Sequence, residues 1–286
     1  LAVGLTLLGF GISAFVTANA AGALIAAYGV MATFGIFGVA LAAVLVLAAL
    51  PLRFPPQGWR PAGWSPPAPG VGTAPLCECD RRTMLRTGAF YGLFACYFIG
   101  CLAGLTAISI AKPVGTEVAG VDAGLATLLV GFFAVFNGLG RPAFGGLADR
   151  ISPQKTAMLA FGLIAAASVL IWLVPGVPAY VVSFAVLWGC LGGWLAIAPA
   201  ATASYFGTCD YPRCYGVVFL AYGAGAIAGP QLAGFVRTAT GTYLGVFPLV
   251  AALAVVGFIV AWLLMRPPTG VQASAEEEGR RLTPSP

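Results

Sequence analysis

The sequence predicts an all-α membrane protein. Of its 286 residues, 60% are hydrophobic and only 8% are charged, whereas a soluble domain carries about 25% charged residues. Apolar runs recur along the chain at the length of roughly 20 residues that a helix needs to cross a bilayer. Lipid and helix packing then bury the apolar surface, so a soluble globular domain is excluded. The net charge of +5 does not indicate a nucleic-acid-binding protein, because the basic residues fall between the runs.

Eight apolar runs reach spanning length. They cover approximately residues 1–26, 30–52, 88–111, 122–144, 156–174, 178–203, 215–236 and 244–265. The first two runs meet at Tyr28 and Gly29, and this aromatic–glycine pair predicts a tight connection between two helices. The chain begins at Leu1 inside an apolar run, without the basic segment or cleavage site of a signal peptide. We therefore expect the N-terminal part of the protein to be missing.

Proline and charge interrupt the runs in two places. Between Arg53 and Arg86 the chain holds two Pro-Pro pairs, beginning at Pro55 and Pro66, which prevent a spanning helix. After Arg266 the composition turns polar and indicates a disordered tail. We expect four parts: residues 1–52 as the last two helices of an N-terminal half, 53–87 as a cytoplasmic Pro-rich linker, 88–266 as a six-helix C-terminal half and 267–286 as a cytoplasmic tail.

A weak internal repeat favours two halves. Gly9 opens a block that ends at Arg53, and Gly223 opens a block of nearly equal length that ends at Arg266. Parallel six-helix repeats are a transporter architecture with the binding site near the membrane midplane. If the blocks are repeats, four further helices precede Leu1. Chance matching among the 39 glycines of the chain is the alternative.

The distribution of basic residues predicts the orientation. With alternating spans, one side collects Arg53, Arg60, Arg81, Arg82, Arg86, Arg150, Lys155, Arg213, Arg266, Arg280 and Arg281. The opposite side collects only Lys112 and Arg237. Cytoplasmic loops carry the excess of lysine and arginine, so we expect a multi-pass protein of the plasma (inner) membrane whose linker and C-terminus are cytoplasmic.

Arg141 is the ionisable residue that stands out within the spans. It lies eight residues before Asp149, or roughly 12 Å of helix below the predicted boundary with water. An arginine at that depth costs about 2.5–3.5 kcal/mol on insertion scales, so we expect it to face a wet cavity or an anionic partner. Asn137 is one turn earlier and shares its face. The alternative is a structural arginine that snorkels to the headgroups or caps carbonyls of a neighbouring helix.

A single fixed positive charge predicts an anionic cargo. The predicted spans hold no mid-membrane Asp or Glu, and a guanidinium binds a carboxylate bidentately. We expect a small carboxylate as the partner, held by Arg141 and Asn137. Aromatic residues could line the same cavity, namely Tyr222, Phe219, Trp194 and Tyr97; ordinary packing or lipid contact is the alternative for each of them.

Enzymatic and metal-dependent functions are disfavoured. The chain has no histidine, which excludes histidine relays and histidine metal sites. Cys77 and Cys79 form the only close cysteine pair, and without a second pair they are a weak zinc signal. HExxH, GxSxG and Walker-A motifs are absent from the sequence. We expect no enzyme, no ATP-driven pump and no cofactor.

Several segments resemble one transporter family. Gly145-Gly-Leu-Ala-Asp149-Arg150, followed by Lys155, resembles the cytoplasmic motif of the major facilitator superfamily between helices eight and nine, although Ser152-Pro153-Gln154 replaces part of its usual continuation. Further segments are similar to the oxalate:formate antiporter family within it: Phe136-Asn-Gly-Leu-Gly-Arg141, Pro55-Pro-Gln-Gly-Trp59, Phe219-Leu-Ala-Tyr222-Gly223, Tyr205-Phe-Gly207 and Tyr215-Gly216. The resemblance implies a major facilitator-type bundle in which residues 1 to about 266 form helices five to twelve.

The resemblance also implies roles for single residues. The helix-eight arginine of that family binds substrate carboxylate, which implies this role for Arg141. The oxalate exchanger has a lysine in helix eleven where this chain has Tyr222, so one of two charges is absent and a monocarboxylate is favoured. The motif aspartate of the superfamily stabilises the outward-open state, which implies a gating role for Asp149 with Arg150 and Gly145.

Together these features predict a secondary transporter of small organic anions that works by alternating access. The expected cargo is a monocarboxylate such as formate, lactate or pyruvate, or else oxalate. The expected protein is a monomer within the lipid bilayer. A major facilitator protein for another cargo, such as a drug or sugar, and a truncated fragment that does not transport are the alternatives.

Overall fold

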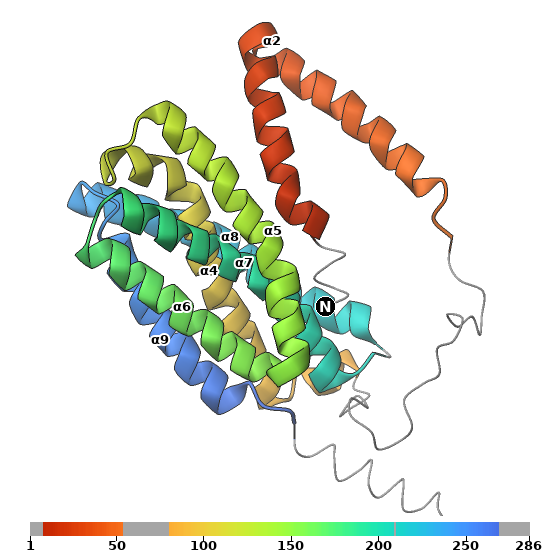
Figure 1. The fold of residues 1–286 in the computed structure, drawn as a ribbon. Helices are drawn as coiled ribbons and strands as arrows, with labels where there is room; N and C mark the ends of the chain where they lie inside the picture. The colour runs from red at the N-terminus through yellow and green to blue at the C-terminus, as the bar shows by residue number, and fades with distance from the viewer. Residues whose placement is uncertain (1–7, 54–79, 209, 269–286) are drawn as a thin grey trace, which may run out of the picture. The chain divides into compact units, whose positions relative to one another are not determined.

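The computed structural model describes residues 8–53, 80–208 and 210–268, and these residues are helical with short connections (Figure 1). The helices are α2 (Leu8–Ala49), α3 (Arg81–Met84), α4 (Gly88–Glu117), α5 (Ala123–Ile151), α6 (Pro153–Leu173), α7 (Val177–Phe206), α8 (Tyr211–Thr240) and α9 (Val246–Leu264). Seven helices in this part are long and apolar enough to cross a membrane. The predicted all-α membrane class is confirmed, while the start of the first predicted run lies outside the described residues.

α2 contains two of the predicted spans and breaks where the sequence predicts a connection. Gly29 has φ 76° and ψ 171° inside it, a backbone conformation that side chains disfavour and glycine adopts readily. Four residues later, the Thr33 hydroxyl donates a hydrogen bond of 2.8 Å to the Gly29 carbonyl. Most of the expected linker and nearly all of the expected tail lie outside the described residues, so the expected division into parts stays a prediction.

The helices extend further than the apolar runs that predict them. α4 continues through Lys112 and Pro113 to Glu117, and α5 continues through Asp149 and Arg150. Charged residues end an apolar run but do not end a helix, whose backbone hydrogen bonds continue into the polar interface. α5 stops at Ser152, which has φ 122° and whose hydroxyl accepts a hydrogen bond from the Lys155 amide to start α6.

Helices α4 and α7 form the centre of the bundle that α4 to α9 build (Figure 1). Two thirds of the most apolar window of α4 is buried, and 78% of that of α7. α5 packs on α7, α8 packs on α4, and α6 packs on α9 and α7. The hydrophobic core therefore follows α4 and α7, and the other four helices surround it.

Glycines set the close approach of α5 to α7. A Cβ at Gly192 would overlap the carbonyl oxygen of Asn137, and a Cβ at Gly140 would overlap the carbonyl oxygen of Gly189. Small residues let membrane helices pack backbone to backbone. This approach fixes the position of Asn137, and with it the position of Arg141 one turn later on α5.

Polar contacts join helices at the two ends of the bundle. At one end, the Arg81 amide donates to Asp210 at 3.3 Å, and Gln154 donates to the Ala261 carbonyl at 3.0 Å. At the other end, Arg237 pairs with Glu117 at 3.0 Å. The first end also carries an open polar pocket of about 490 Å³ that is lined by Asp80, Arg81, Arg82, Asp210 and Arg213.

Candidate anion-binding site

Arg141 is the only charged residue that is buried in the part of the chain that the structure describes. Its exposed fraction is 1%, and it lies ten residues before the end of α5, or about 15 Å along the helix. Pro142 follows it and cannot donate a helical hydrogen bond to the Gly138 carbonyl. The structure thus places a permanent positive charge inside the bundle.

Asn137 connects Arg141 to α7. Its side-chain amide nitrogen donates to the Trp188 carbonyl at 3.2 Å, and its side-chain oxygen accepts from Nη2 of Arg141 at 3.4 Å. Both residues lie on one face of α5 because they are four residues apart. Asn137 therefore orients the guanidinium from a point that is fixed on the neighbouring helix.

Two substitutions of Asn137 test this orientation. Asn137→Ala removes one neutral hydrogen bond, a contribution of about 1 kcal/mol, so we expect anion affinity to fall roughly three- to tenfold. Asn137→Asp keeps the shape but places a carboxylate against the guanidinium, and we expect it to abolish anion binding while the protein stays folded. Equilibrium binding of labelled pyruvate to both purified variants measures this. Equal, small losses in both variants would contradict the placement of Asn137.

Three tyrosines on two other helices lie within electrostatic range of the Arg141 guanidinium. Tyr97 on α4 and Tyr215 and Tyr222 on α8 all interact electrostatically with Arg141. The ring centroid of Tyr97 lies 6.5 Å from that of Tyr222. Phenol hydroxyls donate hydrogen bonds, so this cluster offers several donors and one cation. Such a group of side chains suits an anion that has more than one acceptor atom.

Phe219 and Tyr222 form one stacked pair on α8. Their ring centroids are 5.1 Å apart and their planes differ by 9°, and the ring of Tyr97 lies 6.4 Å from that of Phe219. Phe219 is 42% exposed, whereas Tyr97 is fully buried. The structure thus brings both predicted α8 residues into contact with Tyr97 on α4.

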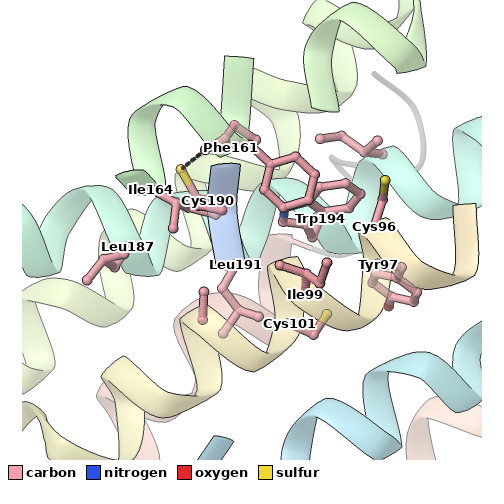
Figure 2. Packing of buried hydrophobic residues seen from close by; sticks show 14 of the residues in the cluster. Cys96, Tyr97, Ile99, Cys101, Phe161, Ile164, Leu187, Cys190, Leu191 and Trp194 are labelled. Carbon is pink, nitrogen blue, oxygen red and sulfur yellow. Dashed lines mark hydrogen bonds between the residues drawn. The ribbon is translucent and has the colours of Figure 1, made fainter. Parts of the chain in front are cut away.

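Trp194 lies deeper in the packing core. Figure 2 shows its indole between Phe161 and the α4 residues Cys96 and Tyr97, and the ring centroids of Phe161 and Trp194 are 5.0 Å apart. Its edge fills the space beside Gly100, where any Cβ would overlap the indole. Trp194 packs against the ring of Tyr97, with ring centroids 6.4 Å apart. Its link to the candidate site is therefore this contact with Tyr97.

Comparison of the sequence with known proteins shows the family of this chain. The sequence profile of the Major Facilitator Superfamily matches residues 1–204 and 93–286. The chain belongs to the Major Facilitator Superfamily. The family resemblance that the motifs predict is confirmed.

Two curated members of the superfamily are similar in sequence to this chain. The chain is 27% identical over 263 residues to the "Oxalate:formate antiporter" of Oxalobacter formigenes, a match that covers 91% of this chain and 60% of that protein. It is 26% identical over 149 residues to the "Uncharacterized MFS-type transporter YhjX" of Escherichia coli (strain K12), covering 50% of this chain and 36% of that protein. The matches thus span about 60% or less of the length of these relatives.

The superfamily motif lies at the end of α5. Gly145 is buried one turn after Arg141, whereas Asp149 and Arg150 are exposed beside the connection to α6. Two turns of helix separate these charges from the guanidinium. The structure therefore places the charged residues of the predicted gate at a different level of α5 from Asn137 and Arg141.

Tyr215 is the cluster residue that the sequence did not single out for binding. It lies seven residues before Tyr222, which is two turns of helix and hence the same face. Tyr211, Tyr215 and Phe219 continue this face as an aromatic ladder, with ring centroids 5.6 and 5.7 Å apart. The i, i+4 spacing of these aromatics was the available signal.

Proposed function

We propose that this member of the Major Facilitator Superfamily is a secondary transporter of small monocarboxylates that works by alternating access. Arg141 carries this proposal, because a buried guanidinium is stabilised by an anion. It binds the carboxylate, Asn137 orients it, and Tyr222 with Phe219 closes one side. The similarity to the oxalate:formate antiporter supports a carboxylate as the cargo.

A single positive charge in the site favours a cargo with one carboxylate group over a cargo with two. The described residues around Arg141 include aromatic, amide and hydroxyl groups but no second buried cation. A dianion would leave its second charge without a partner, and an unpaired charge at this depth costs several kcal/mol. Formate, lactate and pyruvate therefore fit better than oxalate.

We also propose a location and a gate. The excess of basic residues on one side of the spans favours a plasma membrane protein whose linker and C-terminus are cytoplasmic. Asp149, Arg150 and Gly145 would then lie at the cytoplasmic end of α5, where a charge pair can form and break as the bundle rocks. This gate controls whether cargo can reach the site from the cytoplasm, whereas Arg141 binds the cargo.

Uptake by proteoliposomes tests the proposed transport. The intact gene product is reconstituted and supplied with labelled formate, pyruvate, lactate, oxalate and a neutral sugar. We expect saturable uptake of the monocarboxylates, weaker uptake of oxalate and no uptake of the sugar. Saturable sugar uptake without carboxylate uptake would replace the proposal with a transporter of another cargo, and the absence of all uptake would favour the fragment alternative.

A charge added at Tyr222 tests the preference for one carboxylate. Tyr222→Lys places a second cation within electrostatic range of Arg141, so we expect the ratio of oxalate to formate affinity to rise at least about tenfold. Tyr222→Phe is the matched control and should leave this ratio unchanged. Competition of unlabelled oxalate and formate against a labelled carboxylate gives the ratio. An unchanged ratio in Tyr222→Lys would show that Tyr222 does not face the cargo.

A further inference from the structure

Tyr97 holds a hydroxyl that the described part of the protein leaves unsatisfied. The residue is 0% exposed, and its hydroxyl makes no hydrogen bond with any residue that the structure describes. A buried donor without a partner is unfavourable, because it loses its water without replacing it. This hydroxyl therefore points to a hydrogen-bond acceptor from outside the chain.

Two other buried tyrosines of the bundle, in contrast, donate hydrogen bonds to backbone carbonyls. The Tyr180 hydroxyl donates to the Ala111 carbonyl at 2.8 Å, and the Tyr205 hydroxyl donates to the Met265 carbonyl at 3.2 Å. Ser168 and Ser183 also hold buried hydroxyls without a hydrogen bond in the described part, so this property alone does not identify a site. What distinguishes Tyr97 is that it lies within electrostatic range of Arg141 and packs against Tyr222, which is also within that range.

The polar groups closest to the Tyr97 hydroxyl are a second hydroxyl and a thiol. The Tyr215 hydroxyl and the Cys101 thiol are its polar neighbours, but neither lies in hydrogen-bonding geometry with it. Tyr97 and Arg141 interact electrostatically across the same space. Tyr215 and Tyr222 are only half-buried, so water can satisfy their hydroxyls, whereas Tyr97 is fully buried.

When Arg141 holds a carboxylate, the Tyr97 hydroxyl remains as a hydrogen-bond donor that the carboxylate does not use. The two oxygens of the carboxylate take the two parallel N–H groups of a bidentate guanidinium. An oxygen on the next carbon of the cargo, as in a 2-oxo or 2-hydroxy acid, then remains as the acceptor. A site built to hydrogen-bond such an oxygen rejects the analogue that lacks it, because its own buried group is left unpaired.

We propose that the Tyr97 hydroxyl donates a hydrogen bond to the C2 oxygen of the cargo and selects 2-oxo and 2-hydroxy acids over unsubstituted carboxylates. This inference rests on the proposed function and narrows its substrate class. It assigns to α4 a specificity-determining residue, while charge recognition stays with Arg141 on α5.

Pyruvate and propionate form the probe pair, since both are three-carbon anions at pH 7 and differ at C2. Equilibrium binding of each is measured with the purified intact gene product, with Tyr97→Phe and with Tyr180→Phe. We expect the unsubstituted protein to bind pyruvate at least about tenfold more tightly than propionate. Tyr97→Phe should lose this preference by weakening pyruvate binding alone, whereas Tyr180→Phe should keep it.

Thermal unfolding without ligand gives the second readout. Tyr97→Phe removes an unsatisfied hydroxyl, so we expect its midpoint to stay or rise, whereas Tyr180→Phe breaks a hydrogen bond and should lower it. A preference for pyruvate that survives in Tyr97→Phe, or an equal loss for both acids, would overturn the inference and leave the proposed function standing. Failure of both acids to bind the unsubstituted protein would overturn both.

Discussion

Arg141→Gln should reduce carboxylate uptake by roughly 30-fold or more, and to background if the cargo depends on charge alone. Truncating one partner of a buried hydrogen-bonded charge pair costs about 2–5 kcal/mol, and each 1.4 kcal/mol is a factor of about ten. Arg141→Lys keeps the charge but loses the planar fork, so we expect an intermediate loss. Initial rates of labelled pyruvate uptake into proteoliposomes measure both variants.

The same substitution separates binding from structure. Arg141 is buried at a cost, so a protein without cargo should unfold at the same or a higher temperature when glutamine replaces it. A structural arginine that caps carbonyls would behave in the opposite way, with lower stability in Arg141→Gln. Normal carboxylate uptake in a stable Arg141→Gln protein would remove this residue from the mechanism.

Gly192→Ala should prevent correct folding of the bundle. The added Cβ would overlap the carbonyl oxygen of Asn137, which belongs to the backbone of α5 and cannot rotate away. Overpacking costs typically 1–3 kcal/mol and occasionally more, and here it must move α5 away from the central helix α7. We expect a loss of at least about 3 kcal/mol and little folded protein in detergent, measured by size-exclusion profile and thermal unfolding.

Gly189→Ala is the matched control on the same helix. Its added Cβ would meet only the Phe136 carbonyl at 3.7 Å, an ordinary contact, and alanine favours helix over glycine by about 1 kcal/mol. We expect this variant to fold as well as the unsubstituted protein. Equal expression and stability of both variants would show that α5 and α7 do not approach each other this closely.

Apolar length predicts the helices of this protein well but predicts their ends poorly. The break at Gly29 and the six spans after the linker follow from composition, because lipid leaves the backbone no alternative to a helix. α4 and α5 run past Lys112 and Asp149 because a helix end depends on capping, as at Ser152, rather than on hydropathy.

The candidate site is only half visible in the sequence. Arg141 and Asn137 stand out because charge and amide are rare in an apolar run and because a spacing of four aligns them. The significance of Tyr97 is hidden, since aromatic residues are common in spans and only the fold shows which hydroxyl lacks an acceptor. The burial of Trp194 is also hidden in the sequence. Its indole fills the space beside Gly100, which belongs to another helix, and only the fold brings the two together.

The most direct test is the distance between bound carboxylate and guanidinium. Solid-state NMR on the intact gene product in lipid, with ¹³C-carboxyl pyruvate and ¹⁵N-guanidinium arginine, reports this contact through dipolar dephasing. We expect strong dephasing, as for N···O contacts of about 2.7–2.9 Å, and its loss in Arg141→Lys while pyruvate remains bound at saturating concentration. Bound pyruvate that shows no dephasing, or equal dephasing in Arg141→Lys, would contradict the account.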